Sequence, residues 1–240
     1  MAYSSKNACT QKPSALSIIT FILYLVQVAL HSVYIVPGVI KINHPILWVF
    51  LGVHYACLMF VMHDYVWIMV HDPVDRLVLD PDLIENFEYY QLEDCHICGK
   101  RIKGSHHCST CGRCTEDFDH HCKFLNNCIG KHNYEVFIRL LSLNLLYFTI
   151  SVGESIWVLA AAIRNSSVRE AIPPSFYVII GLIFISVILF ISILILEVFH
   201  CYISFNAITT LDYIIDNPSA DSKKDENPPE TSRRLKWYCF

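Results

Sequence analysis

The chain has 240 residues, of which 54% are hydrophobic and 17% charged, and its mean hydropathy is +0.40. That composition is too apolar for an ordinary soluble domain, so we expect a lipid bilayer as a partner. The formal net charge of −4 gives no sign of a nucleic-acid partner, and none is expected.

Four apolar stretches are long enough to cross a bilayer, whose core of roughly 30 Å needs about 20 helical residues. We predict transmembrane helices at residues 14–36, 46–70, 136–163 and 176–201. The first should end at Pro37-Gly38. It is too long for a signal-peptide core and no small-residue cleavage site follows it, so we expect it to be retained. The predicted fold class is an all-α polytopic membrane protein.

Lys and Arg set the orientation of such helices, because they are enriched on the cytosolic side. With four spans, the N-terminal residues 1–13, the loop 71–135 and the tail 202–240 share one side. Fourteen of the 18 Lys and Arg residues lie there, and a fifteenth, Arg139, lies at the adjoining end of the third helix. The short loops carry the other three: Lys41, Arg164 and Arg169. We therefore expect the long loop and both termini to face the cytosol.

Polar side chains occur within the second and third predicted helices: His54, His63, Asp64, Asn144 and Glu154. An ionisable group at membrane depth is a functional candidate. We favour the simpler interpretation, in which His63 and Asp64 face cytosolic headgroups and Glu154 lies near the opposite interface. The tail is polar and rich in Pro, Ser, Lys and Asp, which predicts disorder from about residue 217.

The long loop contains the core of a zinc domain over residues 95–128, CHICGKRIKGSHHCSTCGRCTEDFDHHCKFLNNC, with seven of the 11 cysteines. A two-residue spacing lets two thiolates reach one ion at about 2.3 Å. Cys95 and Cys98 form one such pair, and Cys108 and Cys111 form another. Metal-ligand spacing and reduced thiols both favour the cytosol. Such short knuckles have little core, so the metal would supply the folding free energy.

Two tetrahedral zinc sites need eight ligands. Seven Cys with one His would fill both sites, and six Cys with two His would fill both and leave one thiol. The second count is favoured by Asp119, His120 and Cys122, which supply an orienting acid, a base and a nucleophile. If His121 binds metal, His120 on an extended backbone points to the opposite side. An ordinary zinc module with Cys122 as a ligand is the alternative.

The order C-x2-C, then HC-x2-C-x2-C-x4-DHHC-x5-C, between the second and third of four membrane helices resembles the DHHC-type protein S-acyltransferases, or palmitoyltransferases. The similarity extends over most of the chain, because Asp72-Pro73 follows the second helix and Thr209-Thr210-Leu211-Asp212 follows the fourth. Members of this family lie in the endoplasmic reticulum, Golgi or plasma membrane, and the sequence selects none of these.

The resemblance implies two closed, structural Zn2+ sites. One ion would be held by Cys95, Cys98, His107 and Cys114, and the other by Cys108, Cys111, His121 and Cys128. Cys122 would be the nucleophile that attacks a long-chain acyl-CoA. His120, oriented by Asp119, would take its proton. The resulting thioester would pass the acyl group to cysteines of membrane-associated proteins on the cytosolic side.

The chain also departs from the family's commonest pattern. Lys123-Phe124 follows DHHC, and a subset of the family also has Lys at the first of these positions. Val74 follows Asp72-Pro73, and Asp212 stands in place of Glu. The run from Cys98 to His107 is one residue short. These changes leave the triad and the ligands intact, so we expect effects on the rate, the acyl-CoA contacts and the substrate choice. The basic residues Lys100, Arg101 and Lys103 suit either coenzyme A phosphates or anionic headgroups.

Two other functions fit parts of the sequence. A membrane-anchored zinc scaffold would bind partner proteins without turnover. The shortened run before His107 favours it, because that run lacks the usual Pro and Arg. A metal transporter would carry its ligands along the helices, whereas here they concentrate in the loop. Acyl transfer from Cys122 separates the enzyme from the scaffold.

Overall fold

The computed structural model describes residues 12–74, 92–174 and 176–216. The predicted disordered tail from residue 217 lies outside these residues. The chain divides into two compact units. Unit 1 comprises Met1–Ser14, Val66–Ile138 and Val198–Phe240, and unit 2 comprises Ala15–Tyr65 and Arg139–Glu197.

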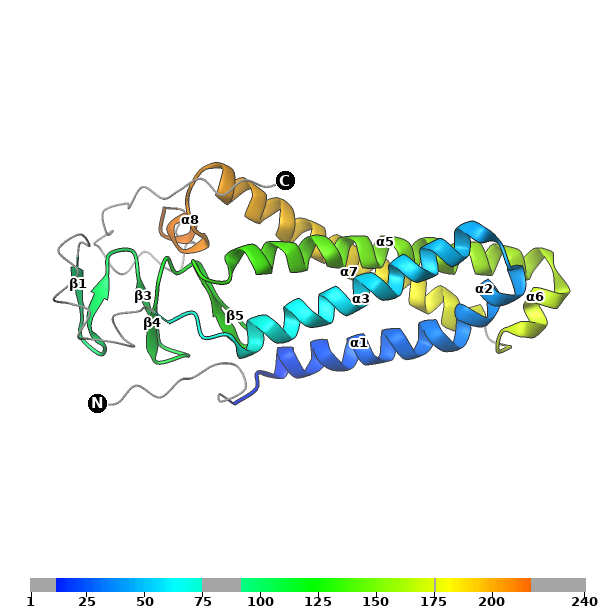
Figure 1. Ribbon diagram of the computed structural model, residues 1–240, viewed down its shortest axis with the longest axis horizontal. Coiled ribbons are helices and arrows are strands. Elements are labelled where there is room, and N and C mark those ends of the chain that lie inside the picture. Colours follow the sequence, from blue (N-terminus) through cyan, green and yellow to red (C-terminus); the bar gives the residue numbers. More distant parts are fainter. Residues whose placement is uncertain (1–11, 75–91, 175, 217–240) are drawn as a thin grey trace. The chain divides into compact units, whose positions relative to one another are not determined.

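Four helical runs of the described chain are long and apolar enough to cross a membrane. They are α1 with α2 (Ala15–Tyr34 and Val36–Ile42), α3 (Pro45–Val70), α5 (Tyr134–Arg164) and α7 (Phe176–Phe205) (Figure 1). The described residues also form two short helices, α6 (Ser166–Ala171) and α8 (Thr210–Asp216). The chain is thus a multi-pass membrane protein with its cysteine-rich segment between the second and third spans.

Unit 2 is apolar outside and partly polar inside. Met59 and Phe184 are 72% and 65% exposed, as expected of side chains that face lipid. Gln27, in contrast, is buried, and its Nε2 donates a hydrogen bond of 2.7 Å to Ser186 Oγ. Hydrogen bonds of this kind join helices in a solvent that offers the side chains no alternative partner.

The first span continues beyond the expected stop at Pro37-Gly38. Pro37 occupies the first turn of α2. N–H groups in a first turn have no acceptor within the helix, so the missing N–H of proline costs no hydrogen bond there. Gly38 lies against α5, because a Cβ at this position would come within 2.4 Å of Val158 Cγ1. The run ends at Asn43, whose left-handed backbone (φ 50°) donates its N–H to Val39 O.

Unit 1 is built on three antiparallel hairpins that follow one another along the chain (Figure 1). Their strands are β1 (Leu92–Cys95) with β2 (Gly99–Ile102), β3 (His106–Cys108) with β4 (Arg113–Thr115), and β5 (His120–Cys122) with β6 (Asn127–Ile129). In the second hairpin His107 is paired with Cys114, and in the third His121 is paired with Cys128.

Polar contacts attach these hairpins to the end of α3 within unit 1. Asn127 Nδ2 donates to the carbonyls of Ile68 and His71, both at 2.7 Å, and so satisfies acceptors that a helix end leaves open. Arg113 is 1% exposed, and its Nε lies 3.1 Å from Asp72 Oδ1. The Asp72-Pro73 motif therefore supplies the counter-ion of a buried guanidinium.

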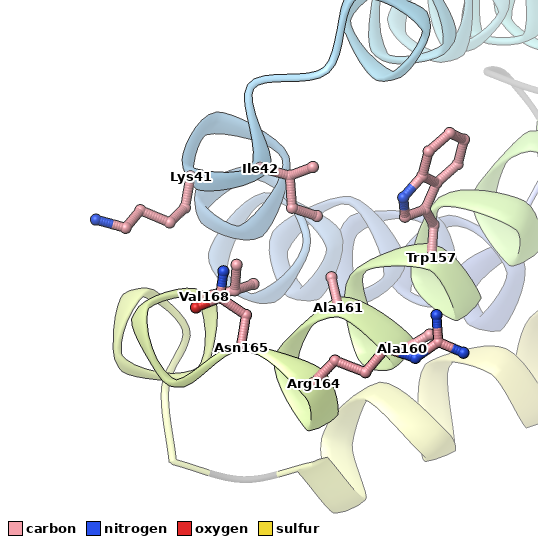
Figure 2. A pocket seen from close by; sticks show the side chains of 8 residues that line it. All are labelled: Lys41, Ile42, Trp157, Ala160, Ala161, Arg164, Asn165 and Val168. Atoms are coloured by element: carbon pink, nitrogen blue, oxygen red, sulfur yellow. The ribbon is translucent and has the colours of Figure 1, made fainter.

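An open pocket lies among α2, α5 and α6 in unit 2, and Figure 2 shows its lining. The Lys41 side chain points away from Trp157 and Arg164. The two cations do not converge, so the pocket offers no built anion site. None of the site residues predicted from the sequence lines it.

Candidate active site and metal centres

The first and second hairpins together form a cluster of four ligand-type side chains: Cys95, Cys98, His107 and Cys114. His107 Nδ1 lies 3.7, 3.3 and 4.0 Å from the three sulfurs in that order. The Cys98 N–H donates to Cys95 Sγ at 3.4 Å, and Gly99 follows with φ 87°, a conformation that glycine adopts without strain. The two-residue spacing thus folds into a tight knuckle.

The second and third hairpins form the second cluster in the same way: Cys108, Cys111, His121 and Cys128. Here His121 Nδ1 lies 3.7, 3.3 and 3.8 Å from the three sulfurs. Cys111 N–H donates to Cys108 Sγ at 3.4 Å, and Gly112 has φ 66°. The structure therefore brings all eight residues expected as zinc ligands into two sets of four.

Both clusters fit tetrahedral zinc. Ligand atoms at about 2.3 Å (sulfur) and 2.0–2.1 Å (nitrogen) from one ion are separated by about 3.6 Å, close to the distances seen. Cys111 and Cys128 do not form a disulfide bond, because their sulfurs lie 3.3 Å apart. Hydrogen bonding to Cys108, and then to Cys111, raises the pKa of His121 to about 9. The sulfurs thus favour positive charge at the place where a divalent cation would bind.

Cys122 belongs to neither cluster, although the other six loop cysteines are divided between them. The reason is the alternation of side chains along β5. Successive residues of a strand point to opposite faces, so His121 faces the second cluster while His120 and Cys122 share the other face. The thiol is 8% exposed.

Asp119 and His120 form a close pair beside this thiol. His120 Nδ1 donates to Asp119 Oδ2 at 2.7 Å. Burial disfavours the charged imidazolium, but hydrogen bonds to Asp119 and Cys122 outweigh it and raise the pKa of His120 to about 9. Burial alone would raise the pKa of Asp119, but its hydrogen bonds to His120 and Thr210 lower it. The geometry therefore stabilises the protonated form of His120 beside the Asp119 carboxylate.

The Thr-Thr motif after the fourth span positions Asp119. Thr210 donates to it twice, from the backbone N–H to Oδ1 at 2.8 Å and from the hydroxyl to Oδ2 at 2.7 Å. Thr209 caps α8, because its backbone N–H and its hydroxyl donate to Asp212 Oδ2 at 3.0 and 2.6 Å, and Asp212 N–H donates back at 3.1 Å. This is a capping box, and the short Asp212 side chain completes it.

His200 was not among the residues expected at the site. Its ring centroid lies 5.6 Å from that of His120, and the Tyr134 hydroxyl is 3.2 Å from its Nδ1. Ligand atoms of Asp119, His120 and His200 come within 4.8 Å of one another. A histidine near the end of an otherwise apolar helix was the available signal.

The basic residues of the first hairpin have acidic partners. Lys100 Nζ lies 2.6 Å from Asp94 Oδ1, and Arg101 Nη2 lies 3.0 Å from Glu93 Oε2, in pairs across β1 and β2. Lys103 is exposed in the turn after β2. The acidic partners reduce the field that Lys100 and Arg101 present to a phosphate.

The intramembrane polar residues differ from the simpler expectation. Asp64 does not face headgroups: its side chain is 1% exposed, and Arg139 donates to both of its oxygens, from Nε at 2.8 Å and from Nη2 at 2.7 Å. The His63 side chain is exposed. Glu154 and His54 are buried within unit 2.

Comparisons with known proteins agree with this site. The profile of the family described as DHHC palmitoyltransferase matches residues 88–217, more than half of the chain. Palmitoyltransferase ZDHHC15 of Xenopus laevis is 33% identical over 122 residues, which are 51% of this chain and 35% of that protein. Palmitoyltransferase ZDHHC5 of Rattus norvegicus is 42% identical over 82 residues, 34% of this chain and 12% of that protein.

A plant protein gives a similar match. The probable protein S-acyltransferase 20 of Arabidopsis thaliana is 38% identical over 77 residues, 32% of this chain and 11% of that protein. The chain therefore spans about a third or less of the length of these curated relatives. The matched region contains both ligand clusters, the Asp119–His120–Cys122 group and α8. The chain belongs to the DHHC palmitoyltransferase family.

Proposed function

We propose that this chain is a protein S-acyltransferase that moves a long-chain acyl group from acyl-CoA, through a thioester on Cys122, to cysteines of membrane-associated proteins. The observation that carries the proposal is the position of Cys122. Six loop cysteines are in ligand clusters, whereas the seventh lies beside a histidine that is hydrogen-bonded to a buried carboxylate.

In the first stage Cys122 gives its proton to His120. The thiolate attacks the acyl carbonyl of the CoA thioester, the bond from that carbon to the coenzyme A sulfur breaks, and coenzyme A leaves as a thiol with the proton returned by His120. Asp119 keeps the imidazole in the tautomer whose Nε2 is available for proton transfer. Thr210 in turn holds Asp119.

In the second stage an acceptor cysteine enters, and His120 takes its proton. The acceptor thiolate attacks the acyl group on Cys122, and the Cys122 thiolate leaves and is protonated. One thioester replaces another at each stage, so no ATP is required. The eight cluster residues would hold two zinc ions as structural elements, because each set of four protein ligands is complete.

The bias of Lys and Arg supports a cytosolic location for unit 1 and both termini. We therefore infer that the acceptors are cytosolic cysteines close to an endomembrane or the plasma membrane. Lys103 and the exposed Lys123 next to the half-exposed Phe124 suit contact with coenzyme A phosphates or anionic headgroups.

The test is self-acylation of the purified, zinc-replete protein with labelled palmitoyl-CoA. Cys122→Ser should abolish the label, and hydroxylamine should release the label from the unmodified protein as expected for a thioester. Cys201→Ser is the matched control, since it removes another cysteine of unit 1 that lies outside the clusters, and it should keep the label.

Zinc content separates a chemical role for Cys122 from a structural one. Cys122→Ser should keep about two zinc ions per chain, because both ligand sets are complete without it. Loss of one zinc in that variant would make Cys122 a ligand. An unlabelled, folded, zinc-replete protein would favour the scaffold function instead.

A further inference from the structure

Unit 2 contains a third group of ligand-type side chains, far from the cysteine-rich segment in sequence. His31 on α1, His54 on α3 and Glu154 on α5 are each 1% exposed. One ligand atom from each lies within 4.8 Å of the other two. Three separate helices thus bring two imidazoles and a carboxylate to one point, at a depth where ionisable groups are rare and tend to have a function.

The distances match those around a bound metal ion. His31 Nε2 lies 3.0 Å and His54 Nδ1 3.2 Å from the same oxygen, Glu154 Oε2. Nitrogen and oxygen ligands at 2.0–2.1 Å in tetrahedral positions are about 3.3 Å apart. The two rings stack with centroids 4.0 Å apart and planes at 15°, so their nitrogens approach the carboxylate from the same side.

Hydrogen bonding satisfies this group only in part, through the contact of 3.0 Å between His31 Nε2 and Glu154 Oε2. Among the described residues, the buried atoms His31 Nδ1, His54 Nδ1 and Glu154 Oε1 have no hydrogen-bond partner. His54 Nδ1 is near Glu154 Oε2 but is not aligned for a hydrogen bond. Buried polar atoms are normally paired, and the unpaired His54 Nδ1 beside Glu154 Oε2 calls for an explanation such as an ion.

The buried Asp64 shows that this chain can also neutralise a carboxylate with an arginine. Arg139 donates one hydrogen bond to each oxygen of Asp64. At Glu154 the partners are imidazoles, which are neutral metal ligands when deprotonated. Two histidines and one carboxylate form the donor set of many zinc and non-haem iron sites with an open position.

We propose that His31, His54 and Glu154 form a third metal site, which binds a divalent first-row transition ion such as Zn2+ through two nitrogens and one oxygen. The site lies on the membrane helices and is separate from the two cysteine clusters. With three protein ligands it leaves a coordination position open, so its ion exchanges more readily than the ions of the closed clusters. This inference does not rest on acyl transfer.

The experiment uses the full chain in detergent with its two loop zinc ions retained. A mild chelator first removes loosely held metal, and total metal per chain is counted. Co2+ is then titrated as the probe. We expect one Co2+ per chain beyond the two zinc ions, with weak d–d absorption and without the intense thiolate charge-transfer band that a cysteine site would give.

Two variants and a control assign the ion to its ligands. Glu154→Gln keeps the size of the side chain but removes the anionic oxygen, and His54→Gln removes one nitrogen. Each should weaken Co2+ binding at least tenfold. His44→Gln changes an exposed histidine of unit 2 outside the group and should bind Co2+ like the unmodified chain. Retention of two zinc ions shows that each variant is folded.

Several results would overturn the proposal. One is a zinc-replete, unmodified chain that takes up no further Co2+, which would make the group a hydrogen-bonded element of the bundle. Undiminished binding by Glu154→Gln would place the ion elsewhere, as would a thiolate charge-transfer band in the unmodified chain. Co2+ uptake and the charge-transfer band are both measured on the unmodified chain, so they test the proposal even where a variant misfolds.

Discussion

Thr210 holds Asp119 by two hydrogen bonds, one from its backbone N–H and one from its hydroxyl, although 91 residues separate the two along the chain. Both donors come from the first residue of α8, whose start is fixed by the Thr209–Asp212 capping box. The start of α8 therefore sets the orientation of the carboxylate to which His120 is hydrogen-bonded.

Replacement of Thr210 by valine tests this relationship. Thr210→Val keeps the size of the side chain and the backbone donor but removes the hydroxyl. A lost hydrogen bond to a charged group, worth about 1.5 kcal/mol, corresponds to roughly tenfold in rate. We expect self-acylation to slow by that factor at unchanged zinc content. Thr149→Val, at an exposed threonine of α5, is the matched control; equal rates for the two variants would remove Thr210 from the mechanism.

Asp119→Asn tests the carboxylate itself. The amide can donate a hydrogen bond to His120 and so hold the wrong tautomer, and it no longer stabilises the imidazolium. We expect the rate of self-acylation to fall on the order of 100-fold, the scale of general acid–base catalysis. Stopped-flow or quenched labelling measures the rate. A full rate with an intact fold would show that His120 works without Asp119.

The neighbours His120 and His121 form a matched pair, because they lie on opposite faces of one strand. His121→Ala should leave about one zinc ion per chain and lower the thermal stability, since a closed site with a missing ligand loses its metal. His120→Ala should keep both ions and lose turnover. Zinc analysis of the two purified variants gives the answer, and the opposite pattern would reverse the two roles.

The pair formed by the buried Asp64 and the exposed Arg139 predicts an effect on stability rather than on chemistry. Asp64→Asn removes the anion that accepts two hydrogen bonds from Arg139. Because the Arg139 side chain is 56% exposed and stays hydrated, we expect a loss of about 1 kcal/mol. A double-mutant cycle with Arg139→Gln should give a favourable coupling energy. His63→Gln measures the separate contribution of His63, whose Nδ1 lies 2.9 Å from Asp64 Oδ1. Strictly additive single effects would show that the pair contributes nothing.

The sequence predicted the local ligand clusters better than it predicted the contacts between distant residues. The ligand clusters lie within 34 residues, 95–128, and the cysteine and histidine spacing restricts the ways in which zinc can be bound. The pairing of His107 with Cys114 across a hairpin gives that spacing a physical cause. Thr210 and His200 reach the site from distant elements, so no spacing connects them to Asp119.

The same limit applies inside the membrane. The sequence shows that Glu154 is an ionisable residue within an apolar helix. His31 lies 123 residues away on another helix, and only the packing of the helices shows that the two side chains meet. The continuation of the first helix past Pro37 depended on a local detail, the position of the proline in the first turn of α2. Hydrophobicity alone does not resolve such a detail.

The second and third hairpins share one pattern, HHC-x5-C, so that Cys122 in β5 corresponds to Cys108 in β3. Cys108 belongs to the second ligand cluster, and its knuckle partner three residues later is Cys111. Three residues after Cys122 the chain has Leu125, which is buried. The proposed nucleophile thus occupies the ligand position of a repeat whose second sulfur is missing, so the two-sulfur knuckle that chelates metal in the second hairpin cannot form at Cys122.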